Sequence, residues 1–132
     1  MADIFRVILP VSDLDRAAKF YAELLGAGAG ERVSEYRHYF RCGPVVLALV
    51  DPTPDGATAR PNQEQLYFSV DDLEAVHARA AKLACLSTTE VHGDPGGEIA
   101  MRPWRERSFY ADDPSGNPLC FVERGTEFMG RR

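Results

Sequence analysis

The side chains that most often bind metals or move protons are few and widely spaced in this sequence. They are His38, His77, His92, Cys42, Cys85 and Cys120. No two cysteines have the spacing of a structural zinc site, and an odd number of distant cysteines does not indicate a disulfide framework. Among the histidines, His38 alternates with aromatic residues along a strand-like segment and is a candidate to face a cavity. The spacing predicts no metal site built from these six residues.

The carboxylate pair Asp112-Asp113 is the remaining candidate for acid/base chemistry. It leads into Pro-Ser-Gly-Asn at residues 114–117, a turn signal in which proline presets φ and glycine accepts a positive φ. A general acid and base need a shared, partly desolvated pocket, which a turn seldom provides. We therefore interpret the pair as part of the hairpin that precedes the last strand.

The overall composition is that of a globular protein. The chain has 132 residues, 45% of them hydrophobic, and a formal net charge of -5, which suits one compact domain. Scattered basic residues do not suit a phosphate backbone, and no apolar segment approaches the roughly 20 residues of a membrane span. The first residues lack the pattern of a secretory signal, and the cysteines fit a reducing compartment. We expect a cytoplasmic protein without nucleic-acid or membrane partners.

An internal repeat organises the chain. Five residues of the first half recur in the second half at a constant offset: Val11, Asp13, Leu14, Ala22 and Leu24 return as Val70, Asp72, Leu73, Ala81 and Leu83. In each copy an apolar strand, at residues 4–11 or 65–70, leads through short acidic capping residues into an amphipathic helix. Strand-like segments follow, at residues 35–41 and 44–50 in the first copy and at residues 87–91, 107–112 and 118–123 in the second. The pattern predicts two β-α-β-β-β units.

The predicted boundaries follow from this pattern. We expect a single domain over residues 1–132, with repeat one at about 3–51, a proline-rich linker at 52–63, repeat two at about 64–124 and a tail at 125–132.

Three segments carry a family resemblance. They are ILPVSDLDRAAKFYAELLG, the second motif VDDLE, and the ending PWRERSFYADDPSGNPLCFVE. Together they resemble the vicinal oxygen chelate superfamily of glyoxalases, extradiol dioxygenases and bleomycin-resistance proteins. The resemblance implies an α+β fold in which two β-α-β-β-β repeats form a curved, incomplete mixed β-barrel around a central cavity, and it implies a homodimer. It does not assign a function.

The resemblance also implies where a divalent metal would be held, namely by the first and last strands of each unit. Counting from the VxDL motifs gives Arg6 and Gln65, and counting four residues from the hairpin glycines gives Leu47 and Cys120. Arginine repels a dication, leucine has no lone pair, and a cysteine with a glutamine does not make a stable site for a hard ion. We therefore expect neither a metal nor another cofactor.

A cavity without a metal remains, and strand alternation predicts its lining. The candidate ligand-binding residues are Arg6, Ile8, His38, Leu47, Gln65, Tyr67, Trp104 and Cys120. A buried Arg6 needs an anion, supplied either by a carboxylate of the protein or by the ligand. Trp104 is either a ligand contact or an aromatic plug of the core, and Cys120 is either a small core residue or a reactive thiol.

Two functions stay open on these residues. The first is a metal-independent binding protein for a small acidic or aromatic compound, held by Arg6 and packed by Tyr67 and Trp104. The second is a lyase or dioxygenase of the same superfamily with an atypical metal site, or with an acid/base pair of His38 and Cys120.

Overall fold

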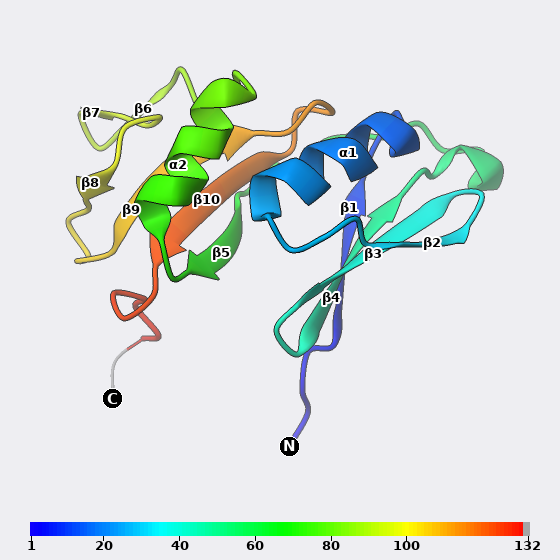
Figure 1. The fold of residues 1–132 in the computed structure, drawn as a ribbon, viewed down its shortest axis with the longest axis horizontal. Coiled ribbons are helices and arrows are strands. Elements are labelled where there is room, and N and C mark those ends of the chain that lie inside the picture. Colours follow the sequence, from blue (N-terminus) through cyan, green and yellow to red (C-terminus); the bar gives the residue numbers. More distant parts are fainter. Residues whose placement is uncertain (131–132) are drawn as a thin grey trace. The chain divides into compact units, whose positions relative to one another are not determined.

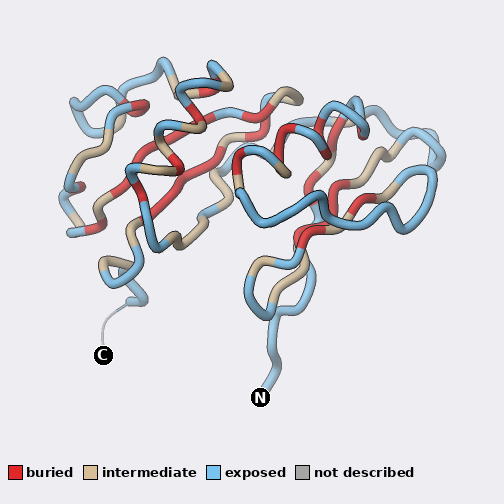
Figure 2. The backbone as a smooth tube through the Cα atoms, in the orientation of Figure 1, coloured by how far each residue is buried: buried red, intermediate tan, exposed pale blue. Residues whose placement is uncertain are grey.

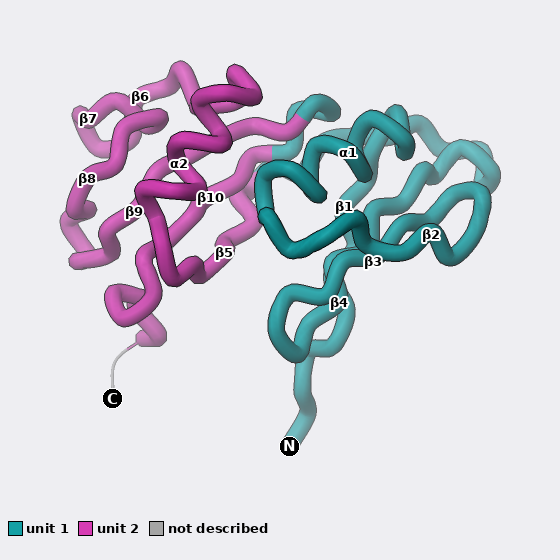
Figure 3. The backbone as a smooth tube through the Cα atoms, in the orientation of Figure 1, with its two compact units in different colours: residues 1–63, 114–117 teal, residues 64–113, 118–132 magenta. Residues whose placement is uncertain are grey.

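The computed structural model describes residues 1–130, and the chain forms two compact units (Figure 3). Unit 1 consists of residues 1–63 and 114–117, and unit 2 consists of residues 64–113 and the chain from Pro118 onward. Arg131 and Arg132, at the end of the predicted tail, lie outside the described residues. No helix within residues 1–130 has the length and apolar character needed to cross a membrane.

Unit 1 is one helix on a four-stranded mixed sheet (Figure 1). Its elements are β1 (Arg6–Pro10), α1 (Leu14–Leu25), β2 (Glu31–Ser34), β3 (Arg37–Cys42), β4 (Val45–Val50) and the short 3-10 helix η1 (Thr53–Asp55). The strand order is β1-β4-β3-β2, with β1 parallel to β4 and the other neighbours antiparallel.

Unit 2 repeats this arrangement with one insertion. Its elements are β5 (Leu66–Val70), α2 (Leu73–Lys82), β6 (Glu90–Val91), β7 (Asp94–Pro95), β8 (Ala100–Met101), β9 (Arg107–Asp112) and β10 (Pro118–Glu123). The sheet order is β5-β10-β9-β8, with β5 parallel to β10, while β6 and β7 form a separate two-stranded hairpin. The predicted α+β class and the two β-α-β-β-β units are confirmed.

Both helices begin where the acidic capping residues predict. The side chain of Asp13 accepts a hydrogen bond from the backbone N–H of Arg16, and Asp72 does the same for Ala75, so each carboxylate satisfies a free amide of the first turn. Helix α1 ends at Gly26, which has a φ of 65° and can adopt this left-handed conformation because it lacks a Cβ.

The register gives each sheet a helix-covered face and an open face. In unit 1 the buried side chains Leu9, Leu49 and Phe40 share the face under α1, since paired residues of neighbouring strands point the same way. In unit 2 the Phe109 and Phe121 rings stack under α2, and the ring of His77 on that helix meets Phe109 edge-on. The term open face is used below for the opposite side of each sheet. Figure 2 shows the buried backbone running along the central strands of both sheets.

One strand prediction needs correction, and two strands of the structure were not predicted. The strand expected at residues 87–91 does not join the sheet of unit 2 along its length; only the bridge from Leu86 to Ala111 precedes it, and β6 pairs with β7. The fourth strand of that sheet is β8, which had no alternating signal because it is two residues long. In unit 1 the edge strand β2 was not predicted, because all four of its residues are exposed and leave no hydrophobic pattern.

The turn between β9 and β10 has a structural role in unit 1. Asn117 is fully buried; its Nδ2 donates to the Pro10 carbonyl at 2.7 Å, and its Oδ1 accepts from the Asn62 backbone N–H at 2.9 Å. The Ser115 hydroxyl accepts from the Ser12 backbone N–H at 3.0 Å. These contacts explain why residues 114–117 belong to unit 1 although the flanking strands belong to unit 2. Asp112 is the last residue of β9 and Asp113 leads into the turn, so the pair belongs to the hairpin as predicted.

Candidate functional site

The open face of unit 2 brings two predicted site residues together. Tyr67 on β5 and Cys120 on β10 are paired in the register, and Tyr110 on β9 is the partner of Cys120 on its other side. Tyr67 is 52% exposed, whereas Cys120 has no exposed surface. Cys120, Tyr110 and Val122 form a small buried cluster against which Val91 of β6 packs. This face therefore offers two phenols around a buried thiol.

These groups are neutral at physiological pH. Burial raises the pKa of Cys120 to about 11, and hydrogen bonding to the Ser108 and Tyr110 side chains opposes this shift only in part. Burial is also the main cause that raises the pKa of Tyr110 and of Tyr67. A neutral thiol is a weak nucleophile and a poor metal ligand, because the thiolate is the reactive form. The arrangement can donate hydrogen bonds and pack against a ligand.

Arg102 is a charged residue buried on the same face. It is 2% exposed, and its guanidinium carbon lies 5.0 Å from the centre of the Tyr110 ring. Its Nε donates to the Ser108 hydroxyl at 3.0 Å, and its Nη2 donates to the carbonyls of Ser108 and Glu98 at 3.0 and 3.2 Å. The remaining nitrogen, Nη1, is buried and has no hydrogen-bond partner within the described chain.

Trp104 lies in the tight turn between β8 and β9, two residues after Arg102. Its Nε1 donates to one carboxylate oxygen of Glu106 at 2.6 Å, and the other oxygen accepts from the Phe128 backbone N–H at 2.8 Å. The ring of His92, at the turn of the β6–β7 hairpin, meets the indole edge-on at 5.0 Å. Trp104 is half-buried and contacts Glu106 and His92, so it has features of both roles considered for it.

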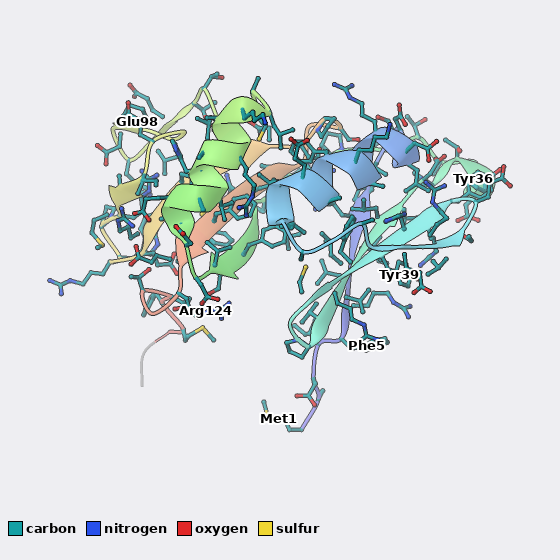
Figure 4. The ribbon with its side chains drawn as sticks, viewed as in Figure 1. Met1, Phe5, Tyr36, Tyr39, Glu98 and Arg124 are labelled. Atoms are coloured by element: carbon teal, nitrogen blue, oxygen red, sulfur yellow. The ribbon has the colours of Figure 1, made fainter. Side chains whose placement is uncertain are left out.

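The open face of unit 1 is cationic and aromatic. Arg6 is exposed, with its guanidinium carbon 5.0 Å from the Phe5 ring centre and 5.3 Å from that of Tyr39, both labelled in Figure 4. Arg37 donates to the Tyr39 hydroxyl at 3.0 Å. Ile8, which the register places on the same face, is 46% exposed. The burial expected for Arg6 is therefore absent, and in residues 1–130 no carboxylate forms an ion pair with it.

Two predicted site residues of unit 1 lie on its helix-covered face. The register pairs Leu47 with Val7, so Leu47 points away from the side of Arg6 and Ile8. His38 pairs with the buried Leu49.

The physical reasons differ for the two residues. The prediction of Leu47 counted four residues from Gly43, as Cys120 is four residues from Gly116. In unit 1 the residue on the open face is instead Ala48, five residues after Gly43. A counting error of one residue places a strand side chain on the opposite face. For His38, Nε2 lies 2.8 Å from the carbonyl of Ala29 and Nδ1 accepts a long hydrogen bond from Arg32, so the ring is part of the core under α1. Alternation alone did not reveal which face His38 occupies.

The residues do not fit the divalent metal that the resemblance implies. Within residues 1–130 no three side chains of histidine, cysteine, aspartate or glutamate are grouped so that they could hold a metal ion. Gln65 is half-buried just before β5, two residues before Tyr67, which pairs with Cys120. In unit 1 the position that corresponds to Gln65 is Arg6, and the position that corresponds to Cys120 is Ala48. Alanine, like the leucine predicted there, has no donor atom.

The comparisons with known proteins agree with this architecture. The family model described as "Glyoxalase/Bleomycin resistance protein/Dioxygenase superfamily" matches residues 3–121. The chain belongs to this superfamily. A search of curated proteins found no match.

Solved structures of the superfamily share the fold over nearly their full length. A glyoxalase/bleomycin resistance protein from Albidiferax ferrireducens T118 is 24% identical, with a TM-score of 0.74 over 92% of this chain and 98% of that one. A lactoylglutathione lyase from Agrobacterium tumefaciens is 22% identical, with a TM-score of 0.68 over 94% and 95%. The oxidase ChaP-H1 is 22% identical, with a TM-score of 0.77 over 98% and 100%. At these identities the likeness supports the fold alone, and the chemistry has to be inferred from the residues described above.

Proposed function

We propose that this superfamily member is a metal-independent small-molecule-binding protein whose ligand is a small acidic or aromatic compound held at the open faces of its sheets. The observation that carries the proposal is that these faces present phenols, a neutral thiol and guanidinium groups at and around the positions where a metal enzyme would have metal-binding side chains. Unit 2 presents Tyr67, Tyr110, a neutral Cys120 and the buried cation Arg102, and no group of metal-binding side chains is found in residues 1–130. Aromatic rings and a guanidinium suit an organic acid.

Arg6 supports the same ligand class from unit 1. Its charge is exposed, lies beside two aromatic rings and forms no ion pair with a carboxylate of residues 1–130. An exposed cation attracts an acid weakly and in a salt-dependent way, because water and salt screen its charge. The proposal further takes the protein to be cytoplasmic and a homodimer; sedimentation of the purified chain would test the oligomeric state.

An enzyme is the second candidate, namely a lyase or dioxygenase with an atypical metal site. Two similar structures, a lactoylglutathione lyase and an oxidase, favour it. The acid/base pair of His38 and Cys120 has less support, because both ring nitrogens of His38 are engaged and the pKa of Cys120 is raised to about 11.

Metal content and ligand binding test the proposal together. Tag-free protein from cells supplied with iron, zinc, manganese and nickel is analysed by mass spectrometry for bound metal, and then screened by thermal shift against small carboxylic acids and neutral aromatic compounds. We expect substoichiometric metal and a higher melting temperature with acids. One tightly held metal ion per chain would refute the proposal and favour the enzyme.

An Arg6→Glu variant tests the contribution of unit 1. We expect the affinity for an acidic ligand to fall severalfold, and to fall less at high salt, because salt screens the exposed charge. Arg16→Glu, the same charge change at an exposed position on α1, is the matched control. Equal affinities of the two folded variants would remove Arg6 from the proposal.

A further inference from the structure

Arg102 is a buried cation whose donors are only partly used. Its Nε and Nη2 donate three hydrogen bonds, to the hydroxyl and carbonyl of Ser108 and to the carbonyl of Glu98. Glu98 is labelled in Figure 4. These partners are neutral, so they orient the guanidinium without cancelling its charge. Nη1, which carries two N–H donors, is buried and has no partner among the described residues. An unsatisfied charged donor in the interior is destabilising, and such groups are rare without a reason.

No carboxylate of the described chain forms an ion pair with this cation. None of the ion pairs within residues 1–130 includes Arg102. Glu106, in the same turn, is largely buried, and its two oxygens are taken by the Trp104 indole and the Phe128 backbone N–H. Buried charges in proteins are generally paired, so the structure lacks the expected counter-ion.

We propose that a small organic monocarboxylate is the missing counter-ion, bound by Nη1 of Arg102 with its apolar part against the ring of Tyr67. This inference rests on the proposed function and names the residue and the ligand class of that site. The groups around Arg102 decide whether the ligand carries one or two negative charges. Cys120 and Tyr110 add no positive charge beside Arg102, and Glu106 is itself an acid, so a single guanidinium has to balance the ligand alone. A phosphate dianion would remain half uncompensated in this interior, whereas a monoanion would be neutralised.

Entry of the ligand requires local movement, because Nη1 is buried. The β6–β7 hairpin packs on the same cluster: Val91 lies against Tyr110, Cys120 and Val122, and His92 lies against Trp104. This hairpin has only two residue pairs in its ladder, and a two-stranded hairpin has little stability of its own. Binding is therefore expected to shift the hairpin and to change the surroundings of Trp104.

The chain's single tryptophan makes the test direct, since Trp104 lies two residues from Arg102. Benzoate is titrated into the intact protein while Trp104 fluorescence and the amide and indole signals of a 15N NMR spectrum are recorded. Benzamide, which has the same ring without the charge, and inorganic phosphate are titrated in parallel. We expect saturable binding of benzoate, weaker binding of both comparators, and signal changes centred on Trp104, Tyr110 and Cys120.

The variant Arg102→Gln should weaken benzoate binding roughly tenfold or more, because a charge-assisted contact is lost. Arg105→Gln, the same loss of charge at an exposed position of the same turn, is the matched control and should bind as the unmodified protein does. If Arg102→Gln does not fold, Arg102→Lys keeps the charge but loses the planar guanidinium, and it should also bind more weakly than the control.

Three results would overturn the inference. They are an affinity for benzoate that is the same in a folded Arg102 variant and in the Arg105 control, tighter binding of phosphate than of benzoate, and no saturable change with benzoate at millimolar concentration. If acids bind but their signals map to unit 1 and respond to Arg6→Glu alone, this inference fails and the proposed function stands. One metal ion per chain refutes the proposed function instead.

Discussion

Cys120 should resist alkylation in the folded protein. It is fully buried on the open face of unit 2, and its thiol is held neutral. The perturbation is a pulse of iodoacetamide at pH 8 on the native chain. The result separates a binding protein from an enzyme that would use this cysteine as a nucleophile or base, since such a role requires an accessible thiolate.

The size of the effect follows from the pKa of Cys120, which burial raises from 9.0 to about 11. At a pH below both values, two pKa units reduce the thiolate fraction about a hundredfold. A more basic thiolate is also more nucleophilic, and a Brønsted slope of about 0.4–0.5 returns roughly an eightfold gain. Ionisation alone therefore slows alkylation about tenfold, and the lack of exposed surface slows it further because the site must first open.

Peptide mass spectrometry after timed quenching measures the rate at Cys120 and at the half-exposed Cys42 in one sample. In denaturant the two rates should become similar, which controls for the intrinsic reactivity of each peptide. If Cys120 in the native chain reacts as fast as it does in denaturant, the assignment of a buried, neutral thiol is refuted and a catalytic role regains support.

Two further predictions concern stability. Asn117→Ala should lower the free energy of unfolding by about 2–4 kcal/mol, because it leaves the Pro10 carbonyl and the Asn62 N–H without a partner. Urea unfolding measures this, and a loss below about 0.5 kcal/mol would contradict the role of the turn. Raising the pH from about 9 to 11 should destabilise the chain, because burial raises the pKa of Cys120 and of Tyr110 in the folded state, so the unfolded chain releases these protons first. This stability is fully present below the unfolded pKa values, and Cys120→Ala should flatten the alkaline loss; an equal slope in the variant would show that the thiol does not contribute.

The elements that sequence patterns predict well here are those with local causes. Asp13 and Asp72 cap the helices, Gly26 ends the first one, and the repeat places the same strand and helix order in both units. Each of these features depends on a few neighbouring residues. The face on which a strand side chain lies depends on the register of the strands instead. The open-face residue is five positions after Gly43 but four positions after Gly116, so the count that is correct for Cys120 wrongly selected Leu47 in unit 1.

The candidate site was only partly predictable for the same reason. Tyr67 and Cys120 follow from alternation, and Ser108 and Tyr110 would have followed from the same alternation along β9. Arg102 carries no such signal, because it lies between β8 and β9 outside any regular strand, and hydrogen bonds to the carbonyls of Glu98 and Ser108 set the direction of its side chain. A buried arginine needs an anion, but the sequence alone placed this requirement on Arg6, which is exposed.

The charges around Cys120 and Arg102 in unit 2 bear on both proposals. Arg102 acts on the same cluster as Cys120, where its charge favours the thiolate, yet burial, together with the negative charge of Glu106, outweighs this effect and the thiol stays neutral. A divalent cation held at Cys120 would need the thiolate and would stand close to an uncompensated guanidinium, so both desolvation and repulsion oppose it. An organic anion at Arg102 relieves the same uncompensated charge. The same side chains that suit a metal poorly on this face would therefore suit an acid under our proposals, and a chain that held a metal at Cys120 would contradict the proposed function on which the Arg102 inference rests.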